Sequence, residues 1–430
     1  MNGLWATLAV FIGLFLLRLP IAIVLIASTI VGLWLAPTPI PIATLPTTLW
    51  QGINHFVLMA IPFFILMGDL ALASGVTKRL VDFAKAFIGH ISGGLAHVGV
   101  IVNMIMAGMS GSDLADAAAT GKILIPAMQK AGYPTGYAAS LIAGAATIGP
   151  LIPPSIAFVI FASATDESVG RLFLGGAVPG VMLGIFLMVQ AYVVAKRNGY
   201  PKEPRVGWAG RGRATISGLP ALMIPLIVLG SILGGVATPT EAAMLGVFAV
   251  ILVGGGLYRE LSVADFARQT IATMRTVGSV FIIIAAAAAF ARVLTLYGAA
   301  DGLAQWFTAL TDNPYVFLFC VNILLLLLGC FLDTVPILLV LVPLLMPTVK
   351  ALGIDTVHFG VVTVFNLLIG LVTPPYGLTM YLLCRMANIS IQEFWRYQWP
   401  IFATMLFALM LVTMFPALTT WLPNLVMPIK

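Results

Sequence analysis

Long, nearly uninterrupted apolar segments recur along this chain. The segments 217–237, 241–257 and 402–422 approach or reach the roughly 20 residues that an α-helix needs to cross a bilayer, with few charges or none. Other apolar segments are interrupted by Pro, Gly or one ionisable residue. The pattern therefore predicts an all-α integral membrane protein.

Composition supports this prediction. Charged residues make up 8% of the chain and hydrophobic residues 61%, whereas a soluble domain has roughly a quarter charged residues. The first apolar segment reaches Leu17 without a basic leader, so we expect two mature spans joined by a tight turn and no cleavable signal peptide. Cys320, Cys330 and Cys384 have no paired spacing and are expected to be packing residues.

One basic loop sets the orientation of the spans. Residues 196–213 hold six Lys and Arg residues against the single acid Glu203, and the positive-inside rule places such a loop in the cytoplasm. Counting outward gives ten spans and two re-entrant hairpins, at about 91–130 and 314–349, with both termini in the periplasm. Arg259, Arg268 and Arg275 are predicted to lie on a separate surface helix, followed by an apolar span at 277–296.

The two halves of the chain resemble each other. Pro126 and Pro347 set an offset of 347 − 126 = 221, and the same offset pairs Gly108 with Gly329 and other Gly and Pro positions. Each half has five predicted spans, an odd number, so the second half begins on the opposite side of the membrane. This predicts an inverted repeat of the kind found in secondary transporters, with residues 1–195 and 217–430 as repeats and residues 196–216 as the cytoplasmic loop.

Each half also contains two places where an apolar helix is predicted to break. The first two breaks lie at 108–113, in the middle of a hairpin, and at 148–155; the others lie at 329–334 and 370–376. Pro frees upstream carbonyl groups and Gly lets them turn toward a ligand. Such carbonyls, together with hydroxyl and carboxylate oxygens, suit a hard cation such as sodium, while helix N-termini suit an anion. The alternative is that these breaks are packing kinks.

We therefore expect two pseudo-equivalent sodium sites, each formed by a hairpin tip and the broken helix of the same half. The first would use Ser110, Ser112, Asp113, Gly149, Ile152 and Pro153, and the second Gly329, Asp333, Thr334, Gly370, Thr373 and Tyr376. An organic anion would lie between the tips, with Pro154, Ser155 and Pro375 as candidate contacts.

Two lone charges lie in apolar segments outside the breaks. Asp69 and Arg292 correspond across the halves at 292 − 69 = 223. They could pair with each other or face the substrate path, where Arg292 would read a substrate carboxylate. Glu241 follows Thr238 and Pro239 and is expected to stabilise a helix N-terminus.

Several long motifs resemble the large membrane subunit of tripartite ATP-independent periplasmic (TRAP) transporters. The resemblance covers essentially the whole chain and rests on the runs SGSDLADAAATGKILIPAMQKAGY, TIGPLIPPS, ATPTEAA, DTVPILLVLVPLLMP and GIDTVHFGVVTVFNLLIGLVTPPYG. It implies a small four-span membrane subunit, a periplasmic substrate-binding protein and a sodium gradient as driving force. It also implies an elevator fold, in which a mobile domain with the hairpins and broken helices slides against a scaffold.

The sequence thus predicts the large subunit of a sodium-coupled importer of organic acid anions, such as C4-dicarboxylates or sialic and sugar acids, in a bacterial or archaeal cytoplasmic membrane. Sodium ions would be the coupling ions, with no other cofactor. A stand-alone sodium/anion symporter remains the alternative. An intramembrane enzyme is disfavoured because no catalytic set such as HExxH occurs. Nucleic acid is not expected as a partner, since no basic patch interleaves with aromatic residues.

Overall fold

The computed structural model describes residues 2–36 and 41–428, and within these ranges the chain is built from helices without a strand. The extreme residues of both termini lie outside the described part. The helices of the first half are α1 (Asn2–Leu16), α2 (Ile21–Trp34), α3 (Leu45–Ile53), α4 (Ala60–Ala73), α5 (Val76–Ile88), α6 (Gly94–Ser110), α7 (Asp113–Lys130), α8 (Thr135–Ala146), α9 (Ile156–Thr165) and α10 (Val169–Asn198), with short 3-10 turns at Ile42–Thr44 and Phe56–Met59.

The second half follows the same plan. Its helices are α11 (Trp208–Leu233), α12 (Pro239–Ile251), which continues as a π-helical segment Leu252–Leu257, α13 (Val263–Leu296), α14 (Ala299–Leu310), α15 (Pro314–Gly329), α16 (Thr334–Ala351), α17 (Thr356–Gly370), α18 (Leu378–Ala387), α19 (Ile391–Met414) and α20 (Ala417–Val426). Helices α7 and α16 begin 334 − 113 = 221 residues apart, as do α8 and α17 at 356 − 135 = 221. The offset found in the sequence is thus also the offset between the helix boundaries.

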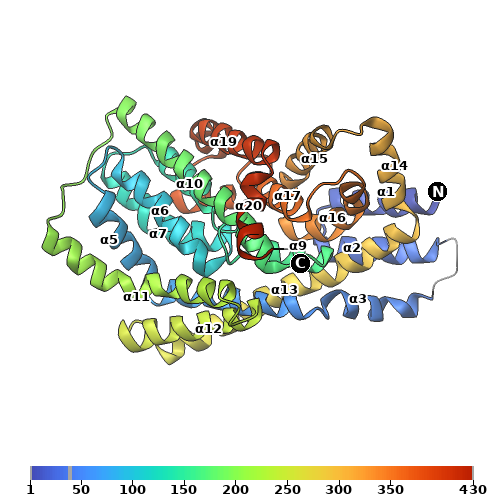
Figure 1. Cartoon of the computed structure of the whole chain (residues 1–430), viewed down its shortest axis with the longest axis horizontal. Helices are drawn as coiled ribbons and strands as arrows, with labels where there is room; N and C mark the ends of the chain where they lie inside the picture. The colour runs from blue at the N-terminus through green and yellow to red at the C-terminus, as the bar shows by residue number, and fades with distance from the viewer. Residues whose placement is uncertain (1, 37–40, 429–430) are drawn as a thin grey trace.

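Both predicted hairpins are present. Helices α6 and α7 are joined through Gly111 and Ser112, and helices α15 and α16 through residues 330–333. Figure 1 places the two hairpins toward opposite ends of the long axis, with α9 and α17 between them. After each hairpin comes a broken helix, α8 with α9 in the first half and α17 with α18 in the second.

Seven described helices are long and apolar enough to cross a membrane. One of them, Thr334–Ala351, is α16 and forms an arm of the second hairpin, which leaves six. Helices α1 and α2 and the two broken helices bring the number to ten. Since α1 has 15 residues, it is only about 22 Å long. The orientation of these helices in a membrane remains a prediction.

The predicted surface helix before residue 277 was wrong. The structure has one continuous helix, α13, of 34 residues from Val263 to Leu296. A capping box formed by Ser262 and Asp265 starts it, and its Arg268 and Arg275 side chains are exposed. Exposed charges do not interrupt a helix, because long side chains can reach solvent while the backbone ladder continues. The change from polar to apolar residues therefore marks no boundary.

The prediction of one continuous span over 402–422 was also wrong at its C-terminal end. Helix α19 ends at Met414 and a separate helix, α20, begins at Ala417. Phe415 lies between them with φ −121° and ψ 84°, a non-helical conformation. Its successor Pro416 disfavours the helical conformation in the preceding residue, which explains the break.

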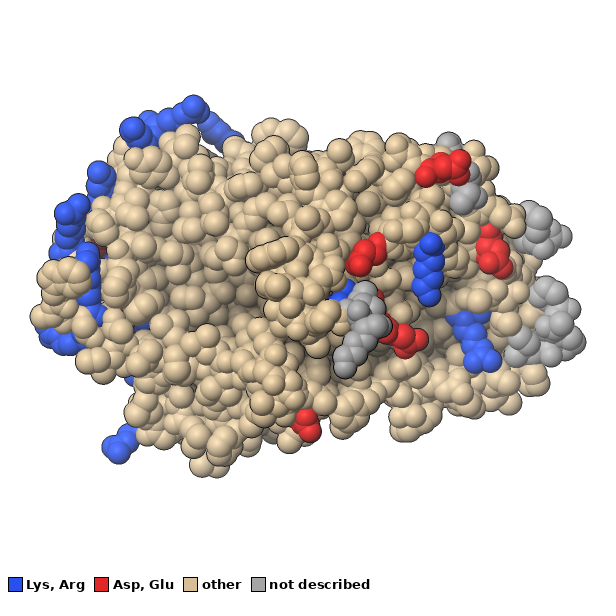
Figure 2. Space-filling model, viewed as in Figure 1, with Lys and Arg blue, Asp and Glu red and all other residues tan. Residues whose placement is uncertain are grey.

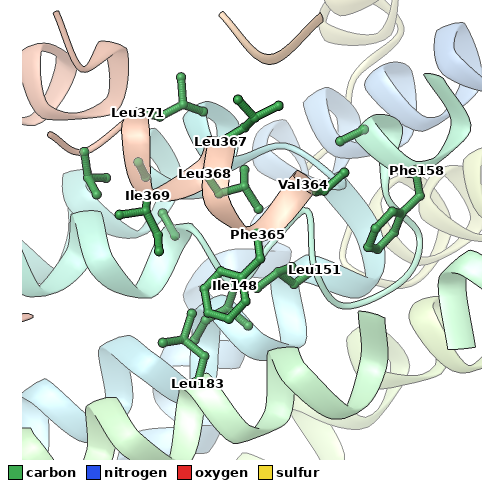
Figure 3. Close-up of a cluster of buried hydrophobic side chains, with 14 of the residues drawn as sticks. Ile148, Leu151, Phe158, Leu183, Val364, Phe365, Leu367, Leu368, Ile369 and Leu371 are labelled. Atoms are coloured by element: carbon green, nitrogen blue, oxygen red, sulfur yellow. The ribbon is translucent and has the colours of Figure 1, made fainter. Parts of the chain in front are cut away.

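The centre of the molecule is a hydrophobic core formed by the two broken helices. Figure 3 shows Ile148, Leu151 and Phe158 of the first half beside Phe365 and neighbouring side chains of α17. All four of these side chains are fully buried. Because both interrupted segments pack into this one core, their positions relative to each other are fixed.

Charges are distributed unevenly over the surface. On the face shown in Figure 2, Lys and Arg side chains gather mainly at the end where Figure 1 places the connection between α10 and α11. Acidic side chains on that face lie mainly toward the other half of the molecule. This is the distribution that the positive-inside rule expects if the α10–α11 connection is cytoplasmic.

Gly370 offers a test of the packing between the second hairpin and its broken helix. A Cβ atom at Gly370 would lie 2.6 Å from the carbonyl carbon of Gly329, a contact with backbone that cannot rotate away. We expect Gly370→Ala to destabilise the protein by about 1–3 kcal/mol, as overpacking does. The measurement is the melting temperature of the purified protein.

The matched control is Gly278→Ala in α13, where an added Cβ would meet nothing within 4 Å. Ala is the better helix former, so this variant should melt at or above the wild-type temperature. Equal melting temperatures for both variants would contradict the proposed close approach of the two glycines.

Candidate functional site

The tip of the first hairpin is a tightly bonded polar turn. Gly111 ends α6 in a left-handed conformation with φ +58°. Ser112 then begins α7 as its N-cap, since its Oγ accepts a hydrogen bond from the Ala115 N–H at 3.4 Å. Ser110 Oγ donates to Asp116 Oδ1 at 2.5 Å. The turn therefore holds two hydroxyl oxygens and a carboxylate close together, and Ser110 and Asp116 among these residues are buried.

Asp116 is a site residue that the sequence interpretation missed. Its side chain is fully buried, and Oδ2 has no hydrogen-bond partner among the described residues. It also faces the first broken helix, because a Cβ atom at Gly149 would collide with this oxygen. Asp116 lies three residues after Asp113, so both carboxylates fall on neighbouring positions of one helix face. That spacing in the motif SGSDLAD was the available signal.

The first broken helix meets this tip directly. A Cβ atom at Gly111 would lie 2.7 Å from the carbonyl oxygen of Pro154. Ser155 Oγ accepts from the Phe158 N–H at 3.2 Å and so caps α9. Between the two helix halves, the carbonyl groups of residues 149–153 accept no hydrogen bond from any described donor. This stretch, which includes Ile152 and Pro153, thus has unbonded carbonyl oxygens, and its first residue, Gly149, lies against the buried Asp116.

The second hairpin meets its own broken helix in the same way. Gly329 packs against Gly370, and the Tyr376 N–H donates to the Cys330 carbonyl at 3.1 Å. Asp333 Oδ1 accepts from the Thr334 N–H at 2.7 Å, which makes Asp333 the N-cap of α16. Each hairpin tip therefore contacts the unwound stretch of its own half, as the sequence predicted.

Of the two threonine hydroxyl groups at the second hairpin and its break, one has a hydrogen-bond partner and the other has none among the described residues. Thr373 Oγ1 donates to the Ile369 carbonyl at 2.6 Å. Thr334 Oγ1 is buried and has no partner among the described residues. Tyr376 is half exposed, and Pro375 is bonded through its carbonyl to the Tyr381 hydroxyl at 3.2 Å.

A cavity of about 360 Å³ opens at this second hairpin. It lies between the hairpin, the second broken helix and the start of the chain, and is lined by Gly329, Phe331, Leu332, Asp333, Pro336, Leu371, Tyr376, Leu378, Phe15 and Ile21. Its volume is within the range of small-molecule sites. The two predicted sodium sites, each formed by a hairpin tip and the broken helix of the same half, are called half-sites. The first half-site is closed, since Ser110 is only 2% exposed and Asp116 0%. The two predicted half-sites thus differ in access.

One hydrogen bond joins the two halves at the first hairpin. Thr379 Oγ1, at the start of α18, donates to Asp113 Oδ2 at the start of α7. Both side chains are buried. The sequence interpretation included Asp113 but not Thr379.

Asp69 and Arg292 do not pair with each other, so that alternative was wrong. Asp69 Oδ2 accepts from Thr273 Oγ1 at 2.7 Å, and Arg292 Nη1 donates to Gln51 Oε1 at 3.4 Å. The two partners are 273 − 51 = 222 residues apart, close to the offset between the charges. The contacts are therefore equivalent in the two halves but opposite in charge. Neither residue lines the cavity at the second hairpin.

Glu241 has the structural role expected from the sequence. Its carboxylate accepts from the Thr238 N–H at 2.7 Å, while Thr238 Oγ1 accepts from the Glu241 N–H at 3.4 Å. This reciprocal capping box starts α12.

Comparison with known proteins agrees with the fold and the motifs. Residues 8–418 match the model of the family described as tripartite ATP-independent periplasmic transporter, DctM component. The chain is 38% identical to the sialic acid TRAP transporter large permease protein SiaM of Vibrio cholerae, over 87% of this chain and 88% of that protein. It is 39% identical to the C4-dicarboxylate TRAP transporter large permease protein DctM of Pseudomonas aeruginosa, over 90% and 91%.

Two further comparisons extend this picture. The 2,3-diketo-L-gulonate TRAP transporter large permease protein YiaN of Escherichia coli is 36% identical, over 89% of each chain. Among solved structures, the YdaH transporter of Alcanivorax borkumensis superposes with a TM-score of 0.66 at 15% identity, over 95% of this chain and 97% of that one. The likeness to the YdaH transporter concerns the fold alone. The family match over nearly the whole chain and the large permeases at more than 30% identity establish that this protein belongs to the DctM family of TRAP transporter large permease subunits and is not an enzyme.

Proposed function

We propose that this subunit imports an organic acid anion together with sodium ions. The observation that carries the proposal is that each hairpin tip packs against the broken helix of its own half, with oxygen atoms left free at the contact. A membrane-embedded helix break is tolerated only where protein or a polar cavity satisfies the backbone. A cation held by those oxygens would serve that purpose.

The first half-site has the oxygen-rich chemistry that a dehydrated hard cation requires. The carbonyl groups of residues 149–153 have no hydrogen-bond donor among the described residues, and Gly149 of this stretch contacts Asp116. Ser110 bonds Asp116, and Ser112 lies in the same turn. An unpaired buried carboxylate inside a membrane is costly, and a bound cation would remove that cost. Cation chemistry therefore explains Asp116 better than a packing kink does.

The second half-site supports the substrate part of the proposal. Its cavity contains Leu378, the first residue of α18, whose N-cap Gly377 supplies no side-chain hydrogen bond. The positive end of the helix dipole at such a helix start favours an anion. The substrates named for the relatives, namely sialic acid, C4-dicarboxylates and 2,3-diketo-L-gulonate, are all organic acids. An organic acid anion is therefore the proposed substrate class.

The movement proposed for transport is an elevator. The two broken helices share the core of Figure 3, and each hairpin tip packs against its own broken helix. These four elements would move as one body, against a scaffold that includes α1–α4 and α11–α13. The family to which the chain belongs is tripartite by name, so a small four-span membrane subunit and a periplasmic binding protein are the proposed partners. Arg292 and Asp69, on the scaffold, are the proposed charged contacts of the substrate outside this body.

Reconstituted uptake tests this proposal. Proteoliposomes that contain this chain and its small partner should accumulate a substrate acid only when the binding protein and an inward sodium gradient are both present, without ATP. The measurement is uptake of a labelled acid, with potassium in place of sodium as the control. Undiminished uptake without binding protein would favour the stand-alone symporter, and undiminished uptake in potassium would refute sodium coupling.

Two substitutions test the oxygen atoms of the half-sites. Ser110→Ala and Thr373→Val remove one hydroxyl from each, so each should raise the sodium concentration for half-maximal uptake, by about three- to tenfold for the loss of one ligand worth about 1 kcal/mol. Thr363→Val is the matched control, because Thr363 is a fully buried α17 residue whose hydroxyl has no partner among the described residues. A folded double variant with wild-type sodium dependence would show that the breaks are kinks.

A further inference from the structure

The hydrogen bond between Asp113 and Thr379 lies between the two half-sites. Asp113 begins the second arm of the first hairpin, next to Ser112. Thr379 is the second residue of α18, the helix that follows the second break. The contact therefore connects parts of the chain that are 266 residues apart.

The bond continues on both sides into groups of the candidate sites. On one side, the Thr379 N–H donates to the Leu371 carbonyl at 3.2 Å, and Leu371 belongs to the second break and lines the cavity. On the other side, Asp113 is in the same turn of hairpin as Ser110, which holds Asp116 against Gly149. A chain of direct contacts thus runs from the second break to the first.

No equivalent hydrogen bond runs from the first half of the chain to the second hairpin among the described residues. The position equivalent to Thr379 is 379 − 221 = 158, which is Phe158, and the position equivalent to Asp113 is 113 + 221 = 334, which is Thr334. Phe158 has no hydroxyl to donate to the second hairpin. The two halves therefore differ at this position. Asp113 and Thr379 are joined by a hydrogen bond, whereas the equivalent residues Thr334 and Phe158 are not.

We infer that Thr379 couples the two half-sites, so that a cation at one raises the affinity of the other. This rests on the proposed function, because it presupposes that both half-sites take sodium. Thr379 is a positioning residue: its hydroxyl fixes one oxygen of Asp113, while its N–H holds the Leu371 carbonyl of the second break. A cation that orders one end therefore pre-orders the other, and coupling of this kind is reciprocal.

The transport consequence is that the half-sites fill together. The mobile body would then contain either no sodium or the full set, which prevents movement with a partial load.

The test is a sodium titration of the purified full-length protein, read as its melting temperature, with choline keeping ionic strength constant. The wild type should give a sigmoidal curve with a Hill coefficient above 1. Thr379→Val keeps the shape of the side chain but lacks the donor, so its Hill coefficient should fall to about 1. Its half-saturating sodium concentration should rise about five- to tenfold, at the lower end of typical coupling effects.

Two matched variants separate coupling from general damage. Thr379→Ser retains the hydroxyl and should keep the wild-type curve, as should Thr363→Val, which removes a fully buried hydroxyl with no described partner. A folded Thr379→Val protein with the wild-type Hill coefficient would overturn the inference. So would a wild-type protein that binds two sodium ions without cooperativity, a result that requires no variant. A wild type whose melting temperature does not respond to sodium would instead contradict the proposed function itself.

Discussion

The structure depends on one constraint, that backbone polar groups inside a bilayer must find partners within the protein. Four helix ends stop in the interior of this molecule, two at hairpin tips and two at breaks. Ser112, Ser155 and Asp333 cap the helices that restart there. The remaining backbone groups are covered because each tip lies on a break, through Gly111 against Pro154 and through Gly329 against Gly370. Glycine is required at Gly111 and Gly370, because a Cβ atom there would lie 2.7 Å and 2.6 Å from the facing backbone.

The same arrangement occurs twice, but the two copies are not chemically equal. The first is closed and contains two buried carboxylates, Asp113 and Asp116. The second opens into a cavity and places its acid, Asp333, as a helix cap. The scaffold repeats this inequality, since Asp69 and Arg292 make equivalent contacts with opposite charge.

Much of the architecture could be predicted from the sequence, because Gly and Pro at a constant offset mark the breaks and apolar length marks the spans. The failures have physical causes. Helix α13 passes through the change from polar to apolar residues, since exposed Arg268 and Arg275 cost the helix nothing. Helix α19 ends early because Pro416 restricts Phe415, a local effect that average hydropathy does not register.

The candidate site was predicted at its hairpin tips and breaks, but not in its connections. Asp116 was overlooked beside Asp113, although helical spacing brings the two carboxylates to one face. Thr379 could not have been found, because nothing local in the sequence indicates that α18 of one half reaches the hairpin of the other. Contacts between distant segments depend on how the whole core packs, and motif analysis works within one segment at a time.

The central claim is that cations occupy the contacts between tips and breaks, and ion density tests it most directly. Structures of the full transporter in sodium and in thallium, a heavier monovalent cation, should show two peaks that strengthen with thallium. One would lie between Ser110, Asp116 and the carbonyls after Gly149, and the other between Asp333 or Thr334 and residues 370–373. Clear density for these side chains with water or nothing at both places, under conditions that support transport, would contradict the account.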